Sequence, residues 1–524
     1  MDRFFHYESG AAARRPARSR VCGEALEIVE RVGGETTLGG VGEPSLWTIA
    51  EAGDEWSDWC LKDIKGYANA PFVGCERDAS SSLLTGVGSA AAALGLQLIA
   101  LVLAAHFLRR GQLGAAVAIG IAPWALLLGR AWIGRVLTLG LLAGAVVWAN
   151  TAILFVRVRL SIGQPWGRLA LILGGVTALT ALSPLLLRVG VLRRLTEPRT
   201  GAFVWAPAFA ALLTAALLAM VQLKVPRPML LAERFWPGFG WLQVLAAALY
   251  AGFAAEKLLS AEAARWRRRI WTLFSIVFFV QLALGLLADV RFLMRPGVLH
   301  FPIPALILGG PLYRGGHFFM LALFLSTLVL VGPAWCSHIC YLGAWDNLAA
   351  QLGPRRPRAL PRWSLPARVA LLVALMGVAY GLGRLGASPL LAGSLALLFG
   401  LVGVGLMLVI SRHRGAMVHC ALYCPLGLVA NLLGKISPFR LRISEGCTAC
   451  GRCTLACRYD ALGPERLAAK RVGLSCTLCG DCLPSCKSGD IRMWLPGVSP
   501  PVARAIFVTL VVALHAASLC LARV

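Results

Sequence analysis

The chain has 524 residues and carries 51 Lys and Arg against 25 Asp and Glu, a formal net charge of +26. Only 15% of its residues are charged and 58% are hydrophobic, whereas soluble globular chains have about 25% charged and about 45–50% apolar residues. This composition excludes a soluble globular protein and a disordered one. The basic residues form short clusters between long apolar runs, which indicates the loops of a membrane protein and no nucleic-acid partner.

The apolar runs predict an all-α polytopic membrane protein in contact with a lipid bilayer. A bilayer core of roughly 30 Å needs about 20 apolar residues in a helix, and these runs lack the alternation of barrel strands. We expect about 11 transmembrane helices. The runs cover residues 84–107, 113–129, 133–155, 169–187, 202–223, 241–259, 270–290, 317–335, 369–385, 390–410 and 502–521.

The basic loops predict the orientation of these helices. Arginine and lysine are densest at 188–199, 257–269 and 355–368, and all three loops lie on one side if the helices alternate. By the positive-inside rule that side is the cytoplasm, with the N-terminus inside and the C-terminus outside. The arginines at 109–110 and 157–159 fall on the opposite side, against the rule. No cleavable signal peptide is visible, so we expect a multi-pass protein of a bacterial-type inner membrane.

Two cysteine quartets with the same spacing, C-x2-C-x2-C-x3-C, lie between the last two apolar runs. This spacing wraps three thiolates around one iron–sulfur cube and sends the fourth to the other cube. A single C-x2-C would suit zinc as well, but two complete quartets favour two 4Fe-4S clusters. We expect Cys447, Cys450, Cys453 and Cys486 to hold one cluster, and Cys476, Cys479, Cys482 and Cys457 the other.

These quartets predict a small α+β two-cluster domain of the bacterial ferredoxin type. Gly451 and Gly480 stand at matching positions, as two copies of one loop require. The bacterial pattern has a proline after each fourth cysteine, where this chain has Arg458 and Lys487. We expect that change to loosen the turn, or to place a cation beside the cluster, without removing a ligand.

A second repeat precedes the quartets. The segments CSHICYLGAWDNL, from Cys336, and CALYCPLGLVANL, from Cys420, agree at six of thirteen positions. Each follows an apolar run, and a hairpin of the two runs between them would bring both copies to the membrane face that carries the ferredoxin-like segment. Cys336, Cys340, Cys420 and Cys424 are then either buried inert thiols, a redox-active thiol pair or a metal site. His338 and His419 are weaker candidates for further ligands.

On these motifs the chain resembles the membrane polyferredoxins of the NapH and NosR type, with the copper-oxidase assembly protein CcoG as a more distant relative. The resemblance covers about residues 317–495 and rests on the tandem Cys-x3-Cys motifs followed by the two quartets. Tyr341 replaces the family's proline in the first copy, which leaves the start of the following helix open.

This resemblance implies electron transfer from quinol to a respiratory reductase, through clusters on the cytoplasmic side. The chain's partners are then quinone or quinol and a redox partner protein, and any enzymatic role is that of a quinol-dehydrogenase-type electron-transfer subunit. The alternative is a CcoG-like factor for metal (copper) reduction and assembly, or a redox-sensing regulatory membrane protein. The direction of electron flow does not follow from the sequence, because cluster potentials depend on their surroundings.

The motifs divide the chain into five segments. An N-terminal soluble segment of unknown role is expected over 1–82, a seven-span region over 83–316, and a core with the tandem motifs over 317–440. The ferredoxin-like domain covers 441–495 and a last transmembrane helix 496–524.

Smaller signals have simple explanations. Cys60 and Cys75 are reduced thiols if cytoplasmic, or a disulfide if the topology is inverted. His106 and His515 are expected to make ordinary intramembrane hydrogen bonds rather than to bind haem. Glu256 is expected to be a charge near a helix end.

Overall fold

A computed structural model describes residues 79–197, 204–293 and 302–521 of the chain, all of them in one unit that covers Asp78–Val524. The segment expected over 1–82, with Cys60 and Cys75, lies outside the described residues except for its last few positions. Helix α3 already begins at Ala79, five residues before the apolar run expected there.

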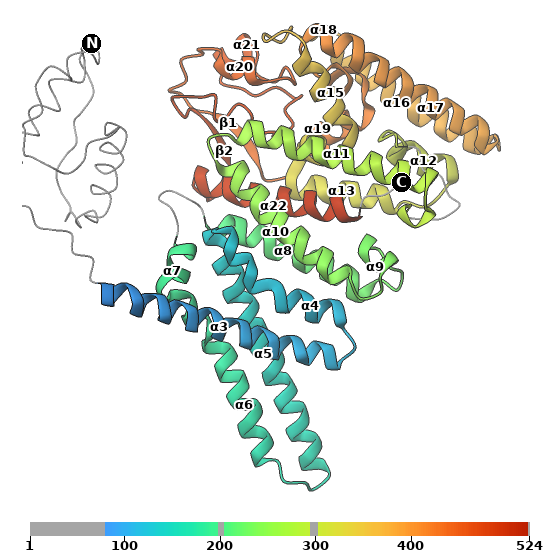
Figure 1. Ribbon diagram of the computed structural model, residues 1–524. Coiled ribbons are helices and arrows are strands. Elements are labelled where there is room, and N and C mark those ends of the chain that lie inside the picture. The colour runs from blue at the N-terminus through green and yellow to red at the C-terminus, as the bar shows by residue number, and fades with distance from the viewer. Residues whose placement is uncertain (1–78, 198–203, 294–301, 522–524) are drawn as a thin grey trace, which may run out of the picture. The chain divides into compact units, whose positions relative to one another are not determined.

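Nine helices of these described ranges are long and apolar enough to cross a membrane, which supports a multi-pass membrane protein (Figure 1). The other two expected runs also fold as helices, but the run over 113–129 forms only a nine-residue α-helix and a seven-residue 3-10 helix. The run over 241–259 becomes a 20-residue helix that includes Glu256 and Lys257. The count of about 11 spans therefore stays a prediction. The nine candidate spans are Gly88–Arg109, Ala131–Ser161, Gly167–Arg188, Trp205–Lys224, Ala263–Leu287, Phe319–His338, Ser364–Arg384, Pro389–Arg414 and Pro500–Leu521.

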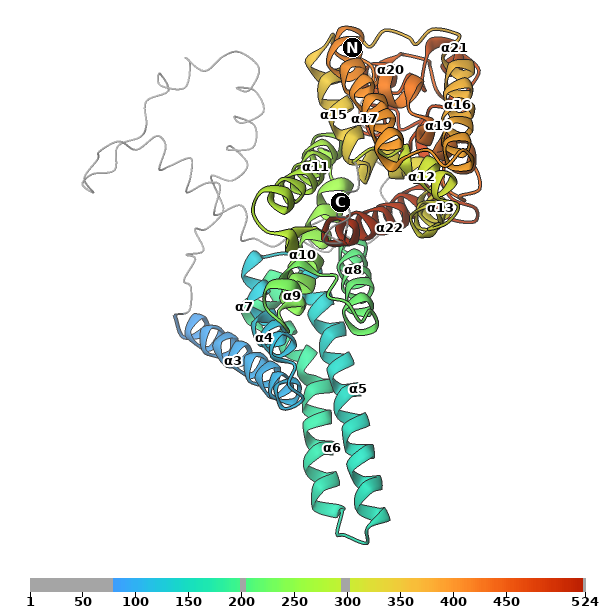
Figure 2. The same ribbon diagram turned by 90° about the vertical axis from the view of Figure 1, so that its right-hand side faces the viewer.

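The N-terminal half of the described chain is a bundle of helices. Helix α8 packs along α10, α5 along α6 and α3 along α4; Figure 2 shows α5 and α6 as a pair of adjacent helices. Glu256 on α10 binds Arg130 at 2.6 Å and accepts a 3.0 Å hydrogen bond from Trp132 Nε1. The bounds are α3 Ala79–Arg109, α4 Leu113–Ile121, η1 Ala122–Leu128, α5 Ala131–Ser161, α6 Gly167–Leu182, η2 Ser183–Arg188, α7 Gly190–Thr196, α8 Trp205–Lys224, α9 Leu231–Phe235, α10 Gly240–Leu259, α11 Ala263–Leu287 and η3 Val290–Phe292.

The second half contains both tandem motifs, each between a long helix and a shorter amphipathic one. The first motif follows α13 and leads into α15, and the second follows α17 and leads into α19. Helix α16 packs on α12 and α19, and α15 packs on α11. The bounds are α12 Leu306–Arg314, α13 Phe319–Val331, η4 Gly332–Ala334, α14 Trp335–His338, α15 Tyr341–Leu352, α16 Ser364–Arg384, α17 Pro389–Leu406, η5 Met407–Ser411, α18 Arg412–Arg414, η6 His419–Tyr423 and α19 Pro425–Leu433.

Two short antiparallel strands close the cysteine-rich segment. Strand β1 (Arg440–Ile443) pairs with β2 (Ile491–Trp494), with Arg440 opposite Trp494 and Ile443 opposite Ile491. The segment between them has two short helices, α20 (Arg452–Ala456) and α21 (Pro464–Ala468). The Arg442 guanidinium lies 3.6 Å from the centre of the Trp494 ring, across the strand pair.

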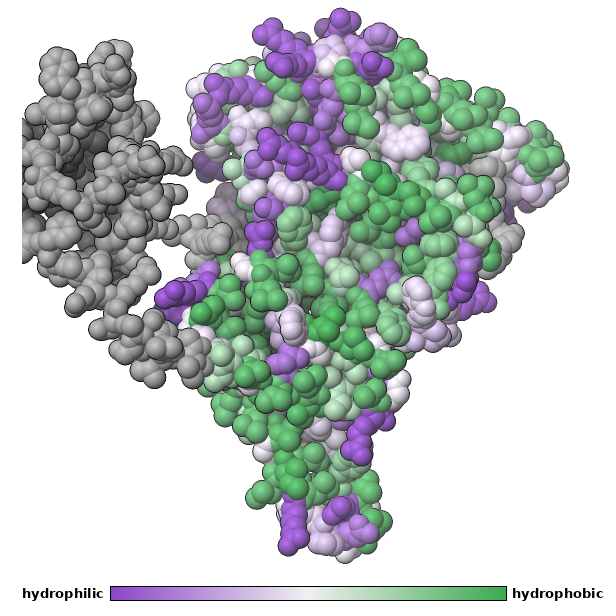
Figure 3. All heavy atoms as spheres, in the orientation of Figure 1, coloured by the Kyte–Doolittle hydropathy of each residue, from purple (hydrophilic) through white to green (hydrophobic). Residues whose placement is uncertain are grey.

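Helix α22 (Pro500–Leu521) follows β2 and joins the cysteine-rich segment to the bundle. It contacts α8, α10, α13 and β2. Among the nine candidate spans it has the largest buried share, 56%, against 11% for α16. Figure 3 shows hydrophilic side chains where Figure 1 places α18, α20, α21 and the start of α11, and hydrophobic ones over the rest of α11 and over α13. The cysteine-rich segment thus lies at a polar end of the helices.

Candidate functional site

The two cysteine quartets have the same unusual backbone conformation. In each copy, three residues at equivalent positions have a positive φ, and three of these six residues are not glycine. Such residues avoid this conformation because of the clash with Cβ, and strained backbone of this kind gathers at functional sites. The quartets are therefore two copies of one loop. The pairs are Ala449 (φ 53°) and Leu478 (53°), Gly451 (75°) and Gly480 (79°), and Asp460 (53°) and Gly489 (70°).

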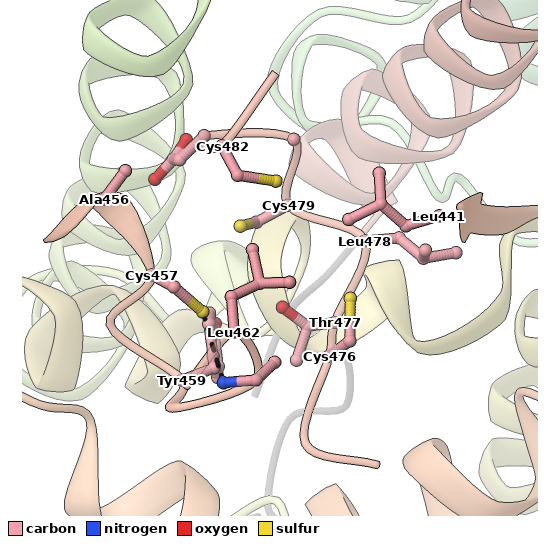
Figure 4. A pocket seen from close by; sticks show the side chains of 13 residues that line it. Leu441, Ala456, Cys457, Tyr459, Leu462, Cys476, Thr477, Leu478, Cys479 and Cys482 are labelled. Carbon is pink, nitrogen blue, oxygen red and sulfur yellow. Dashed lines mark hydrogen bonds between the residues drawn. The ribbon is translucent and has the colours of Figure 1, made fainter. Parts of the chain in front are cut away.

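Four thiols of the second expected set line one pocket, together with Tyr459 and Leu462. Figure 4 shows the side chains of Cys457, Cys476, Cys479 and Cys482 around it. Burial raises the pKa of Cys476 to about 12, and Cys457 adds to the effect. Cys457 thus lies beside three cysteines of the other quartet, in the crossed arrangement that the spacing predicts. All four lie in the cysteine-rich segment, outside the candidate spans.

The first expected set is more exposed. Burial raises the pKa of Cys453, and Cys447 and Cys486 add to it, so Cys486 also lies with the opposite quartet. Cys450 is exposed. Burial acts to raise the pKa of Cys486, but Ser488 and nearby backbone amides outweigh it, and the pKa falls below its ordinary value. A thiolate is the form that binds iron.

Arg458, which replaces a proline of the bacterial pattern, anchors the loop after Cys457. Its Nη1 donates to the carbonyl oxygens of Gly415 at 2.7 Å and Pro354 at 2.9 Å, and its own carbonyl accepts from Met417 N at 2.8 Å. The turn that we expected to be looser is therefore held to the loops that flank the tandem motifs. The segment that contains the quartets is fixed to the membrane part of the chain at this point.

The two tandem motifs have matching backbones and lie against each other. Cys340 and Cys424 are the N-cap residues of α15 and α19, with φ and ψ of −69° and 116° and of −71° and 114°. The helix after Cys340 therefore starts in the same way without a proline at Tyr341. Cys420 N donates to Asp346 Oδ2 at 2.9 Å, which joins the second copy to the first.

The four thiols of the tandem motifs gather in one region, where Cys336 and Cys340 are buried and Cys420 and Cys424 are half-buried. Burial raises the pKa of Cys340 to about 12, and Cys424 adds to it. Burial also raises the pKa of Cys420, to which Asp346, Cys340, Cys424 and Cys336 each contribute. The thiols are therefore within electrostatic range of one another, as the hairpin argument requires.

Polar contacts connect the tandem motifs with the second quartet. Arg267 on α11 forms a bidentate ion pair with Asp481, at 2.7 and 2.6 Å, and donates to Ser337 O at 3.0 Å. Both side chains are buried, at 2% and 10% exposure. Trp271 Nε1 donates to Cys340 O at 2.9 Å. Asp481 lies within the second quartet and Ser337 within the first tandem motif, so one arginine joins these two groups of cysteines.

Of the two histidines expected to make hydrogen bonds, His515 does so, whereas His106 Nε2 is buried and has no hydrogen-bond partner in the described part of the chain. His515 Nε2 lies 2.8 Å from Tyr250 Oη, and its Nδ1 lies 2.7 Å from His338 O. His338 Nδ1 lies 3.0 Å from Ser337 Oγ, while the ring of His106 packs against Trp148. Within the described ranges, no three His, Cys, Asp or Glu side chains converge as tightly as a single metal ion requires.

Residues 315–359 and 396–444 match a family described as a 4Fe-4S binding domain. The match covers less than a fifth of the chain, and both tandem motifs fall within it while the quartets do not. The chain is also similar to the putative electron transport protein YccM of Escherichia coli (strain K12), with 26% identity over 210 residues, covering 32% of this chain and 56% of that protein. It thus spans little more than half the length of that curated relative. No solved structure matches the chain. These findings support an iron–sulfur, ferredoxin-type membrane protein.

Proposed function

We propose that the protein transfers electrons between the quinone pool and a redox partner, through two 4Fe-4S clusters held by the eight quartet cysteines. The observation that carries the proposal is the crossed placement of the fourth cysteines. Cys457 lies with Cys476, Cys479 and Cys482, and Cys486 lies with Cys453. Shared loops of this kind keep two clusters close to each other, which suits the passage of single electrons.

The chemistry of quinol fits a chain of one-electron centres. A quinol that becomes a quinone releases two electrons and two protons. Each cluster takes one electron in its turn, and a partner such as a respiratory reductase accepts the electrons from the exposed side. Cys450 is the most exposed cysteine of the first set, so that set would face the soluble partner. The name of the similar protein, an electron transport protein, supports this role.

The clusters belong on the cytoplasmic side of an inner membrane. The loop over 353–362 is rich in arginine and contacts the cysteine-rich segment, because Arg458 donates to Pro354 O and Leu360 N donates to Asp460 Oδ2 at 2.9 Å. The basic loop and the quartets are therefore on the same side. By the positive-inside rule that side is the cytoplasm. This assignment agrees with about 11 spans and with membership of the NapH and NosR type.

The test is cluster reduction by quinol in anaerobically purified protein. We expect a quinol to reduce the clusters, or a quinone to oxidise them after dithionite, as followed by visible absorption and electron paramagnetic resonance. Cys450→Ser should lose the signal of one cluster, while Cys520→Ser, in a separate apolar cluster with Leu218 and Val244, should keep both. Clusters that dithionite reduces but that exchange electrons with neither quinol nor quinone would contradict the proposal.

One observation favours the alternative that the sequence leaves open. Four thiols, two buried and two half-buried, gather at the tandem motifs, and soft thiolates also suit copper(I). A copper-reducing assembly factor or a redox-sensing regulator would take its electrons from a cytoplasmic donor. The quinol experiment separates the two functions, because the alternative expects reduction by a soluble donor and no response to quinol.

A further inference from the structure

A buried arginine beside the tandem motifs lacks partners for part of its guanidinium. Arg368 on α16 is 3% exposed, and its Nε and Nη2 have no hydrogen-bond partner in the described part of the chain. A buried cation without a counter-charge is strongly destabilising. Its surroundings should therefore include an anion.

The guanidinium lies next to the four thiols. Helix α16 contacts η6, which contains Cys420, and α19, whose N-cap residue is Cys424. A Cβ on Gly427 would be 3.3 Å from Arg368 Nη2 and 3.8 Å from the Cβ of Cys424. Arg368 is also within electrostatic range of Cys336. Protonated thiols are neutral, so four free cysteines would leave this cation uncompensated.

Two helix N-termini face the same place. Cys340 and Cys424 precede the first turns of α15 and α19, and helix N-termini favour negative charge. The cation and both helix ends thus favour an anionic group at the four cysteines.

We infer that Cys336, Cys340, Cys420 and Cys424 hold a third 4Fe-4S cluster, whose negative charge is balanced by Arg368. Four thiolates outweigh the positive charge of the iron–sulfur core, so the assembled group is the anion that the guanidinium lacks. The 4Fe-4S binding domain match supports iron, because its two stretches contain both motifs.

The third cluster lies next to the second quartet. Trp271, Met417 and Tyr459 form one small apolar cluster, and Cys420, Cys457 and Cys479 pack against it. An electron at the tandem motifs therefore has a short path, through packed aromatic side chains, to the second cluster. This step deepens the proposed function and rests on it. The third cluster is then the centre nearest the membrane, where quinol would deliver its electrons.

The test is the iron and labile sulfide content of anaerobically purified protein. We expect about twelve iron atoms per chain from three cubes. Cys424→Ser should lose about four of them and keep the signals of both quartet clusters. Cys450→Ser should also lose about four, but from a quartet cluster. Cys520→Ser, the matched control, should keep all twelve.

Each other result has a separate meaning. About eight iron atoms, unchanged in Cys424→Ser, would overturn the third cluster and leave the two-cluster function standing. Eight iron atoms with one zinc or copper that Cys424→Ser loses would overturn the cluster in favour of a single ion. Four or fewer in the parent would overturn the proposed function itself.

A variant that leaves every ligand in place tests the role of Arg368. Arg368→Gln should keep about twelve iron atoms but lower the reduction potential of one cluster, since removing a nearby cation makes adding an electron harder. Arg368→Lys should restore most of that potential. If the redox titrations of Arg368→Gln and the parent coincide, Arg368 does not balance the cluster. This variant also serves if Cys424→Ser fails to fold.

Discussion

Gly343 and Gly427 occupy equivalent places in the two tandem motifs, and each lies against the carbonyl of the first cysteine of its own copy. A Cβ at Gly343 would be 2.8 Å from Cys336 O, and one at Gly427 would be 2.9 Å from Cys420 O. Cβ atoms do not come so close to a backbone oxygen without displacing it. The glycine of the Leu-Gly pair that the copies share is therefore explained by the close approach of the chain to the first cysteine of each copy.

Gly343→Ala should destabilise the protein by about 1–3 kcal/mol, because the new methyl would also meet the Trp271 ring at 2.7 Å. The matched control is Gly381→Ala on α16, where nothing lies within 4 Å of the added Cβ. The control should be neutral or slightly stabilising. Thermal unfolding in detergent measures both changes. Equal melting temperatures for the two variants would show that the first motif does not pack tightly.

At this scale the sequence predicts which twelve cysteines come together, but not the residues that hold them in place. The repeated spacing identifies the thiols because ligand spacing is a local property. Arg267 and Asp481 form their ion pair across 214 positions, and Arg368 reaches the thiols only after α16 packs on α19. Asp481, inside the CGDC part of the second quartet, is the only local signal among them.

At the scale of elements, α15 shows how a helix begins without the proline that the second copy has. Its N-cap, Cys340, has nearly the same φ and ψ as Cys424, which does precede a proline. Tyr341 instead stacks on Phe278, with ring centres 3.9 Å apart, and its carbonyl accepts from Ser275 Oγ at 2.9 Å. The aromatic side chain thus anchors the start of the helix to α11.

Tyr341→Pro should therefore be no more destabilising than Tyr341→Ala. Proline suits the first position of a helix, where its fixed φ and missing N–H cost nothing, so both variants lose only the stacked ring. Melting temperatures of the two variants in the same detergent test this. A proline variant that melts well below the alanine variant would show that the two copies differ in backbone.

The elements were predictable to different degrees. All expected apolar runs form helices, because hydrophobic length is a strong signal. The π-helical turns η5, before the second motif, and η6, which contains Cys420, have no such signal. Helix α10 is not among the candidate spans, which are defined by length and composition, and its Glu256 is paired with Arg130 in the bundle.

At the scale of the whole molecule, the contacts of Arg458 and Asp460 fix which loops share a side. Reporter fusions after Leu352 and after Gly463 should both report the cytoplasm, since the intervening chain returns to the same face and the flanks are basic. A fusion in the turn between α5 and α6 should be compared with them in the same cells. A periplasmic signal after either Leu352 or Gly463 would contradict the proposed orientation.

The position of α22 sets the order in which the parts of the protein assemble during synthesis. This helix follows the cysteine-rich segment in the chain, and more than half of its span is covered by protein, including α8 and α10. The earlier helices must therefore enter the membrane with a place left open for it, and the cysteine-rich segment is complete before that place is filled. Insertion of α22 is then the step that joins the helix bundle to the cysteine-rich segment. A chain interrupted before Pro500 would leave the faces of α8 and α10 that α22 covers without their protein partner.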